Sequence, residues 1–411
     1  MLRSIISKEI LLNLLSYKFS IITILFTLLI LVSIFVMYRD HCLALENYEI
    51  LQQKTGDEKR TAVIRPTPLS ILVKGLDANL SRFYEIRDGD IKVSGKQQSM
   101  NKIFILFTTP DLLYIVKVIL SLCAMLFAFD IICGEKEKAT LRQTLSNTVK
   151  RPIFIIGKWL GGFISFILPF FVAVLLGTIF VTLSPMVDMI AQDWAKLGLF
   201  FLISVIYLAA FFSLGLMISC LTHRSSTSLV VSLFAWVMLA FLIPNLGNIL
   251  ARQLVRVPSV QQLGQIEEQL FLRFLAEIRI DESKRMEALA RRKNELNKIT
   301  EDYRNRYNRL GKLSQYITRI SPAAVFTFLA TDIMGTGLLE ERRLKRAILQ
   351  HGVILRNWDR DKGDRPAFSF QRSSVKEVLS PKSLVNCFVL ILFNILFFTG
   401  AYVGFLRYDV R

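Results

Sequence analysis

The apolar residues of this chain are gathered in six long runs separated by polar segments. Each run reaches the length of roughly 20 residues that a helix needs to cross the hydrocarbon core of a bilayer. The runs cover residues 19–38, 111–133, 153–183, 197–221, 228–250 and 383–406. This pattern predicts an all-α membrane protein with six transmembrane helices.

Residues 1–18, ahead of the first run, mix apolar and charged positions at helical spacing. Ile5, Ile6 and Leu11 are among the apolar positions, and Arg3 and Lys8 are among the polar ones. A helix with two such faces lies in the membrane interface rather than across the bilayer. We therefore expect an N-terminal amphipathic elbow helix.

Composition supports the membrane assignment. The chain is 53% hydrophobic and its mean hydropathy is +0.44, yet it carries 51 Lys and Arg against 33 Asp and Glu. A single soluble core of this size does not bury that much apolar surface, which excludes a soluble globular domain. The five cysteines and three histidines are scattered, so we expect neither a disulfide framework nor a metal site.

Basic residues in the short loops predict the orientation of the spans. The loop at 134–152 contains Lys136, Lys138, Arg142, Lys150 and Arg151, whereas the short loop after the third run contains Asp188 and Asp193 and no Lys or Arg before Lys196. Both termini, including the tail at 407–411, are therefore expected on the cytoplasmic side of a bacterial inner membrane. The segments 39–110 and 251–382 then lie outside, and the basic charge of the second is compatible with this because long segments escape the rule.

The first external segment, 39–110, contains short pieces that resemble β-strands. Residues 70–73 are apolar and partly β-branched, and the stretches 83–86 and 91–93 flank Asp88-Gly89, a dipeptide typical of hairpin turns. We predict a small β element, with an irregular loop that contains one turn as the alternative.

The second external segment, 251–382, is predicted to be mostly helical. A heptad seam begins at Met286 and alternates steps of three and four residues, as a coiled coil requires. Its further members are Leu289, Lys293, Leu296, Thr300, Tyr303, Tyr307, Leu310, Ser314 and Ile317. An upstream helix with a similar phase is interrupted near Asp281, a residue type that is preferred at helix N-caps, so we predict an antiparallel helical hairpin. One long bent helix is the alternative, and two further helices are expected at 322–332 and 338–355.

The segment 134–152 is the most informative for function. Residues 135–145 predict a short amphipathic helix at the cytoplasmic surface, which Ser146 and Asn147 would end. The side chains that we expect to contact a soluble partner are Glu135, Lys136, Glu137, Lys138, Thr140, Leu141, Arg142 and Leu145.

This segment resembles the permease subunits of type-2 ABC exporters, in which an acidic pair and Thr-Leu precede Leu-Ser, a basic residue and Gly-Lys. Ala139 stands where these permeases usually have glycine. More narrowly, residues 65–76 resemble an outer-loop element of the multicopper-enzyme maturation permeases with large external domains, which include the permease for nitrous oxide reductase.

The resemblance implies six helices, an elbow helix, a cytoplasmic coupling helix and two permease copies or homologues on two ABC ATPase subunits. It also implies that ATP and Mg²⁺ bind to the partner and that this chain is not an enzyme and holds no cofactor. The sequence agrees independently, because it contains no phosphate-binding loop: Gly157-Lys158 is followed by Trp159.

Two polar residues inside the spans are candidate functional residues. Asp130 lies at the inner end of the second span, where a carboxylate needs a partner such as Lys158 or Arg142. Asn394 lies in the sixth span, where an interhelical hydrogen bond is the more ordinary role.

We therefore predict the transmembrane permease subunit of an ATP-driven exporter whose substrate the sequence does not identify. The alternative is a membrane subunit that transmits motion to a periplasmic partner without moving a substrate, which the scarcity of polar residues in the spans keeps open. Membrane lipid is an expected partner, and nucleic acid is not, because the basic segments lack interleaved aromatic residues.

Overall fold

The computed structural model describes residues 2–55, 61–62, 64–77, 84–87, 90–93, 110–146, 150–357, 368–379 and 381–407. The predicted all-α membrane fold is confirmed, because six of the described helices are long and apolar enough to cross a membrane. The residues divide into two compact units, 1–237 with 325–411 and 238–324.

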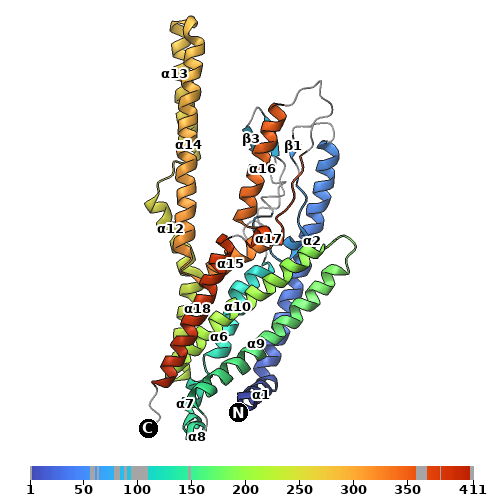
Figure 1. Cartoon of the computed structure of the whole chain (residues 1–411), viewed down its shortest axis with the longest axis vertical. Coiled ribbons are helices and arrows are strands. Elements are labelled where there is room, and N and C mark those ends of the chain that lie inside the picture. The colour runs from blue at the N-terminus through green and yellow to red at the C-terminus, as the bar shows by residue number, and fades with distance from the viewer. Residues whose placement is uncertain are drawn as a thin grey trace. The chain divides into compact units, whose positions relative to one another are not determined.

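The first helices of the larger unit are α1 (Leu2–Leu14) and α2 (Tyr17–Thr55), and both pack against α9 (Arg151–Thr182). The helix α2 continues well beyond the apolar run at 19–38, so the start of the predicted external segment is helical. Figure 1 shows the N-terminus, α7 (Cys133–Glu137) and α8 (Thr140–Ser146) at the same end of this unit.

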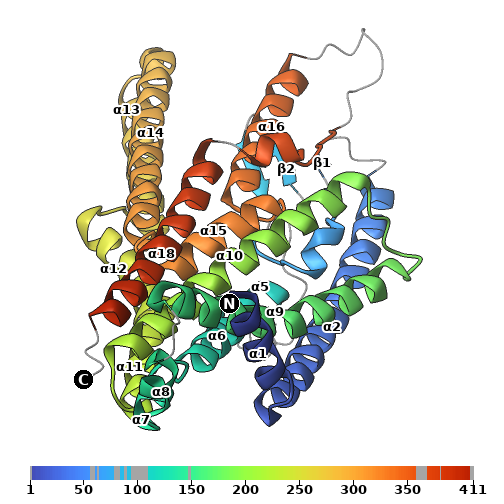
Figure 2. The same cartoon turned by 60° about the horizontal axis from the view of Figure 1, so that its bottom comes forward.

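The centre of the larger unit is α10 (Ala191–Leu221), the most buried of the six spans. It packs against α6 (Ser121–Ala128) and α18 (Pro381–Leu406), as Figure 2 also shows. Tyr207 of α10 is fully buried and stacks on Phe326 of α15 (Pro322–Ile333) with ring centroids 4.3 Å apart. This aromatic pair joins the bundle to the helices that precede α18.

The second span contains a π-helical turn. The short α5 (Leu112–Tyr114) leads into the π-helix η2 (Ile115–Leu120), which continues directly as α6. A π turn leaves carbonyls without their usual helical donors, and here the Tyr207 hydroxyl donates to the Lys117 carbonyl at 2.8 Å. Ser121 Oγ donates to the same carbonyl at 2.6 Å. Two side-chain hydroxyls therefore supply hydrogen bonds to a carbonyl of the π-helix.

The fifth span has the same irregularity. It consists of α11 (Ser225–Val237), the π-helix η3 (Met238–Leu242) and α12 (Ile243–Leu254). Pro244 lies in the first turn of α12 and has no N–H to donate, while the Ser321 hydroxyl donates to the Leu239 carbonyl. The proline and this hydroxyl account for the local change of helix type.

The segment 64–76 contains a short helix that packs against α2 and α10. Residues 70–73 were predicted as a strand, and this prediction is wrong: Pro68–Ile71 form the 3₁₀-helix η1. Pro68 sets the helical φ at the first position, and Ser70 Oγ donates to the Thr67 carbonyl at 2.7 Å. The leucine and isoleucine side chains of η1, Leu69 and Ile71, are fully buried.

The predicted hairpin strands are present. The strands β1 (Thr61–Ala62), β2 (Tyr84–Arg87) and β3 (Asp90–Val93) form an antiparallel sheet in the order β1-β2-β3. Tyr84 pairs with Val93 and Arg87 with Asp90. The dipeptide Asp88-Gly89, from which the hairpin was predicted, lies outside the described residues.

Two helices follow the hairpin of the smaller unit in the chain. They are α15 and α16 (Leu338–Arg356), which match the predicted segments 322–332 and 338–355 and meet at a bend of 42°. The short α17 (Val375–Val378) then precedes α18. Glu340 of α16 is buried and accepts the Ser373 N–H at 3.1 Å, which ties α16 to the segment before α17.

The smaller unit contains the predicted helical hairpin. The helix α13 (Val260–Ile280) ends at Asp281, the 3₁₀-helix η4 (Glu282–Lys284) follows, and α14 (Arg285–Thr318) returns alongside α13. Asp281 Oδ1 accepts the Ser283 N–H at 3.1 Å, so it begins the turn as expected. The alternative of one long helix is therefore wrong.

In the first turns of α14, the residues that pack against α13 lie one position earlier in the chain than the predicted seam residues. Met286 and Leu289 are 77% and 45% exposed, whereas Ala288 is buried. Arg292 lies over the rings of Phe271 and Phe274, at 4.8 Å and 5.4 Å from the centroids. Cation–π contacts of this kind stabilise the helix pair, and a heptad count of apolar residues alone does not register them.

We predict that Gly75→Ala strongly destabilises the larger unit. Gly75 has φ +46°, and a Cβ there would lie 2.7 Å from the Thr336 carbonyl oxygen. Strain and overlap together should lower the free energy of unfolding by about 2–5 kcal/mol. Thermal unfolding of the detergent-purified chain measures this, with Gly198→Ala as the control because a Cβ there meets no atom within 4 Å. Equal melting temperatures for the two variants would contradict the prediction.

Candidate functional site: the α7–α8 segment and its contacts

The predicted helix at 135–145 is two helices, so the prediction of one continuous helix is wrong. The first, α7, ends at Glu137, and α8 begins at Thr140. Between them Ala139 has φ +57°, the left-handed conformation that usually closes a helix at its C-terminus. Glycine takes this conformation without strain, whereas alanine takes it at a cost in free energy.

The first acidic residue of α7 belongs to an ion-pair cluster with two other helices. Lys158 Nζ of α9 lies 2.6 Å from Glu135 Oε1 and 2.8 Å from Glu9 Oε2 of α1. The three side chains are 11–24% exposed, so the pairs are poorly screened by solvent. Lys158, one of the two basic partners that we expected for Asp130, thus pairs with two glutamates.

A close helix crossing lies beside this cluster. A Cβ on Gly157 would lie 2.7 Å from Ile5 Cγ2, and a Cβ on Gly161 would lie 2.7 Å from Glu9 Cβ. Glycines four residues apart on α9 therefore let α1 approach its backbone, as small residues do between membrane helices. The elbow helix is held against the third span by this crossing and by the Glu9–Lys158 ion pair.

The next two residues of α7 hold the turn between α10 and α11. Lys136 Nζ donates to the carbonyl of Cys220 and, at 3.0 Å, to that of Thr222. These carbonyls lie at the C-terminal end of α10, where the helix leaves its acceptors unpaired. Glu137 Oε2 accepts the Ser225 N–H at 3.0 Å and the Ser225 hydroxyl at 2.7 Å. It therefore caps the N-terminus of α11, where a negative charge is favourable.

The start of α7 is in turn capped by α10. Ser219 Oγ accepts the N–H groups of Ile132 and Cys133 at 3.1 Å and 3.0 Å. Ser228 Oγ of α11 donates to the Phe129 carbonyl at 2.7 Å. The chain between α6 and α7 thus leaves helical geometry while its backbone groups remain bonded.

The second helix, α8, is anchored by one leucine. Leu141 is 1% exposed and packs in a cluster with Phe154, Leu216 and Phe405. The residues exposed around it, Lys138, Ala139, Thr140 and Arg142, form what we call the α7–α8 corner. The buried Leu141 side chain attaches this corner to the apolar core of the bundle.

The remaining predicted site residues are placed as follows. Leu145 lies in α8, and Asp130 lies in the turn between α6 and α7. Asn394 Nδ2 donates to the Ile206 carbonyl of α10 and to the Leu390 carbonyl of α18, both at 3.0 Å. Asn394 thus makes the interhelical hydrogen bond that is its ordinary role in a span.

Sequence reasoning did not find Glu9, Ser219 or Ser225 as parts of this site. An acidic residue in an otherwise apolar and basic elbow segment is a signal that could have pointed to Glu9. Ser219 and Ser225 carry no such signal, because their role follows from where α10 ends and α11 begins. No group of three or more His, Cys, Asp or Glu side chains suited to a metal ion occurs within the part of the chain that the structure describes.

Six helices of the described residues are long and apolar enough to cross a membrane, which defines a polytopic membrane protein. A family model described as ABC-2 family transporter protein matches residues 3–410. The chain therefore belongs to the ABC-2 transporter family, whose membrane subunits are non-catalytic and work with an ABC ATPase. No curated protein matches the chain.

We predict that Lys158→Met destabilises the chain by about 2–3 kcal/mol, because it leaves two partly buried carboxylates without their cation. The free energy of unfolding in detergent measures the loss. The same change at the exposed Lys8 of α1 is the matched control and should be nearly neutral. Adding Glu9→Gln and Glu135→Gln to Lys158→Met should recover part of the loss; no recovery would show that the loss does not arise from the ion pairs.

We predict the opposite sign for Ala139→Gly, which should raise the free energy of unfolding by about 0.5–1 kcal/mol by relieving the left-handed strain. Ala290→Gly in the interior of α14 should instead lower it by about 1 kcal/mol. Urea or thermal unfolding followed by circular dichroism distinguishes the two. A destabilised Ala139→Gly variant would contradict the left-handed conformation at this position.

Proposed function

We propose that this chain is the transmembrane permease subunit of a type-2 ABC exporter and that the α7–α8 corner is its contact with the ATPase. The exposed Lys138, Thr140 and Arg142 form the docking surface, and the buried Leu141 fixes it to the bundle. The observation that carries the proposal is the bracing of α7: its side chains bond to α9, α10 and α11. A movement of the corner is therefore transmitted to three membrane spans together.

The bonding of α7 changes the roles that we assign to the predicted coupling residues. Glu135, Lys136 and Glu137 act inside the subunit, where they transmit the movement of the corner. Lys138, Thr140 and Arg142 act at the partner surface. Leu145 belongs with the second group by its place at the end of α8.

The orientation follows the basic charge of the short loops, with both termini and the α7–α8 corner in the cytoplasm of a bacterial cell. Two permease copies on two ATPase subunits complete the assembly, and ATP and Mg²⁺ bind to the ATPases.

Residues 65–76 support a place in the branch that resembles the maturation permeases of multicopper enzymes such as nitrous oxide reductase. The buried Leu69 and Ile71 give that stretch a structural role in the external part.

We predict that Lys138→Glu lowers co-purification of the ATPase subunit by roughly 10-fold, because a reversed charge in an interface opposes its complement. Lys376→Glu, the same change at an exposed residue of α17, should leave it unchanged. Pull-down of the separately encoded ATPase with each tagged permease measures this. Equal recovery with both variants would overturn the docking surface, and ATP hydrolysis by the permease alone would overturn the assignment of function.

A further inference from the structure

The smaller unit contains a pocket of about 660 Å³ whose lining is basic and aromatic. It is formed by the last turn of α12, the connection to α13, the first turn of α13 and the middle of α14. Three arginines line it, Arg252, Arg256 and Arg306, and no aspartate or glutamate occurs among the described residues of the lining. An anionic group is therefore the ligand that the charge of the pocket favours.

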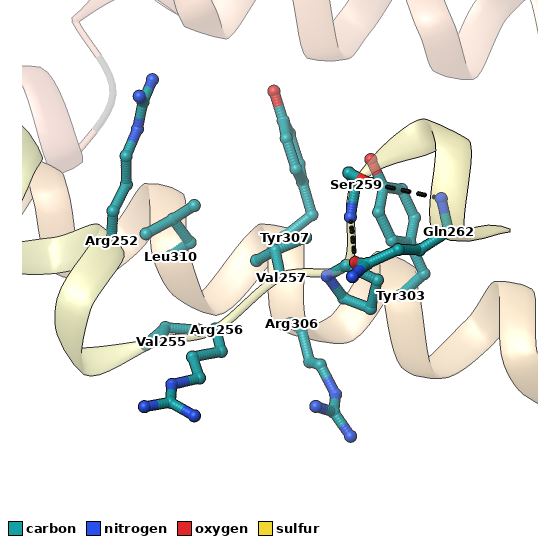
Figure 3. Close-up of a pocket in the computed structure, with 11 residues that line it drawn as sticks. Arg252, Val255, Arg256, Val257, Ser259, Gln262, Tyr303, Arg306, Tyr307 and Leu310 are labelled. Atoms are coloured by element: carbon teal, nitrogen blue, oxygen red, sulfur yellow. Dashed lines mark hydrogen bonds between the residues drawn. The ribbon is translucent and has the colours of Figure 1, made fainter.

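The arginines are placed in two groups. Figure 3 shows Arg256 and Arg306 pointing to the same side of the pocket, while Arg252 and Tyr307 extend to the other side. Arg306 Nε is paired with Asp302 Oδ2 at 2.8 Å, one turn earlier on α14. This pair uses one edge of the guanidinium, so the other N–H groups remain able to donate to an anion.

The rest of the lining is amphipathic. Tyr303 and Tyr307 stack with ring centroids 6.1 Å apart, and Val255, Val257 and Leu310 add apolar surface. The connection is held in shape by Ser259 and Gln262, whose side chains bond reciprocally to each other's backbone N–H at 3.2 Å and 2.9 Å. Tyrosine and apolar side chains beside arginines suit a ligand that has an anionic head and an apolar body.

The pocket lies at the end of a membrane span. The fifth span runs to Leu254, and Ile249, Leu250 and Leu254 of its last turns are exposed in the described chain. Arg252 and Arg256 flank that end, which is where basic and aromatic side chains meet the lipid headgroups. The phosphate groups of the bilayer are therefore within the same layer as the pocket.

We propose that this pocket binds the phosphate of an anionic phospholipid. Arg256 and Arg306 hold the phosphate oxygens, and the acyl chains follow the exposed apolar side of α12. The bound lipid ties the base of the α13–α14 hairpin to the membrane surface.

The test compares lipid retention by the purified full-length chain in nanodiscs that contain equal amounts of phosphatidylglycerol and phosphatidylcholine. Native mass spectrometry of the released complexes counts each lipid. Each arginine near a membrane surface contributes roughly a fivefold preference for anionic lipid, so Arg256→Gln with Arg306→Gln should reduce the preference roughly 25-fold. Arg304→Gln with Arg309→Gln removes the same charge from exposed positions of α14 outside the pocket and should retain the parent's preference.

Circular dichroism and size-exclusion elution establish that both double variants are folded. Equal loss in the two variants, or no loss in either, would overturn the site. A competition arm adds soluble glycerol phosphate, which has the same anionic group without acyl chains. Displacement of the lipid at equal concentration would show a site for free phosphate and would overturn the assignment to phospholipid.

Discussion

The ion pairs of the Lys158 ammonium group are the interaction on which the end of the larger unit that contains α1 and α7 depends. Lys158 lies on a membrane span, yet its two carboxylate partners come from the elbow helix and from α7. A lysine so little exposed is tolerated only where its charge is matched, and the glycines at 157 and 161 bring α1 close enough for Glu9 to do so. Charge and close packing thus require one another at this crossing.

A second constraint is that backbone groups near the membrane must find partners when a helix stops. The second span stops before α7, the fourth stops at Leu221, and the fifth starts at Ser225. All three ends meet in one place, where Ser219, Lys136 and Glu137 bond to the groups that the helices leave open. The segment that we assign to ATPase contact is therefore also the part that closes three helix ends, which gives it little freedom to move independently of them.

The spans and the hairpin could be predicted because their signals are long and repeated. Six apolar runs, and a phase break at Asp281 between two helical patterns, are each supported by many residues. The interruptions could not be predicted in the same way. The break at Ala139 depends on one residue in an unusual conformation. The 3₁₀-helix at Pro68 contains apolar residues that a buried strand would also contain, so the pattern did not distinguish the two. The offset of the seam in α14 arose because Arg292 packs on two phenylalanines, although arginine counts as polar in any heptad pattern.

The candidate coupling residues follow one another in the chain, but the contacts of their side chains could not be predicted. The partners of Glu135, Lys136 and Glu137 come from α9 and from the α10–α11 turn, and the partner of Glu135, Lys158, also binds Glu9 of α1. No spacing rule connects Glu9 with Lys158, because their proximity is a product of how α1 crosses α9. Contacts between single polar residues that lie far apart in the chain are the hardest contacts of a membrane protein to predict from one sequence.

The π turns of the second and fifth spans have a consequence for how these helices are interpreted. One extra residue in a turn rotates everything that follows by about 100° relative to an uninterrupted α-helix. A helical wheel drawn through the whole second span therefore places the residues after Leu120 on the wrong side of the helix. The same holds after Leu242 in the fifth span. In each span, the sequence positions that share one face before the π-helix are rotated by about 100° from the positions that would continue that face after it.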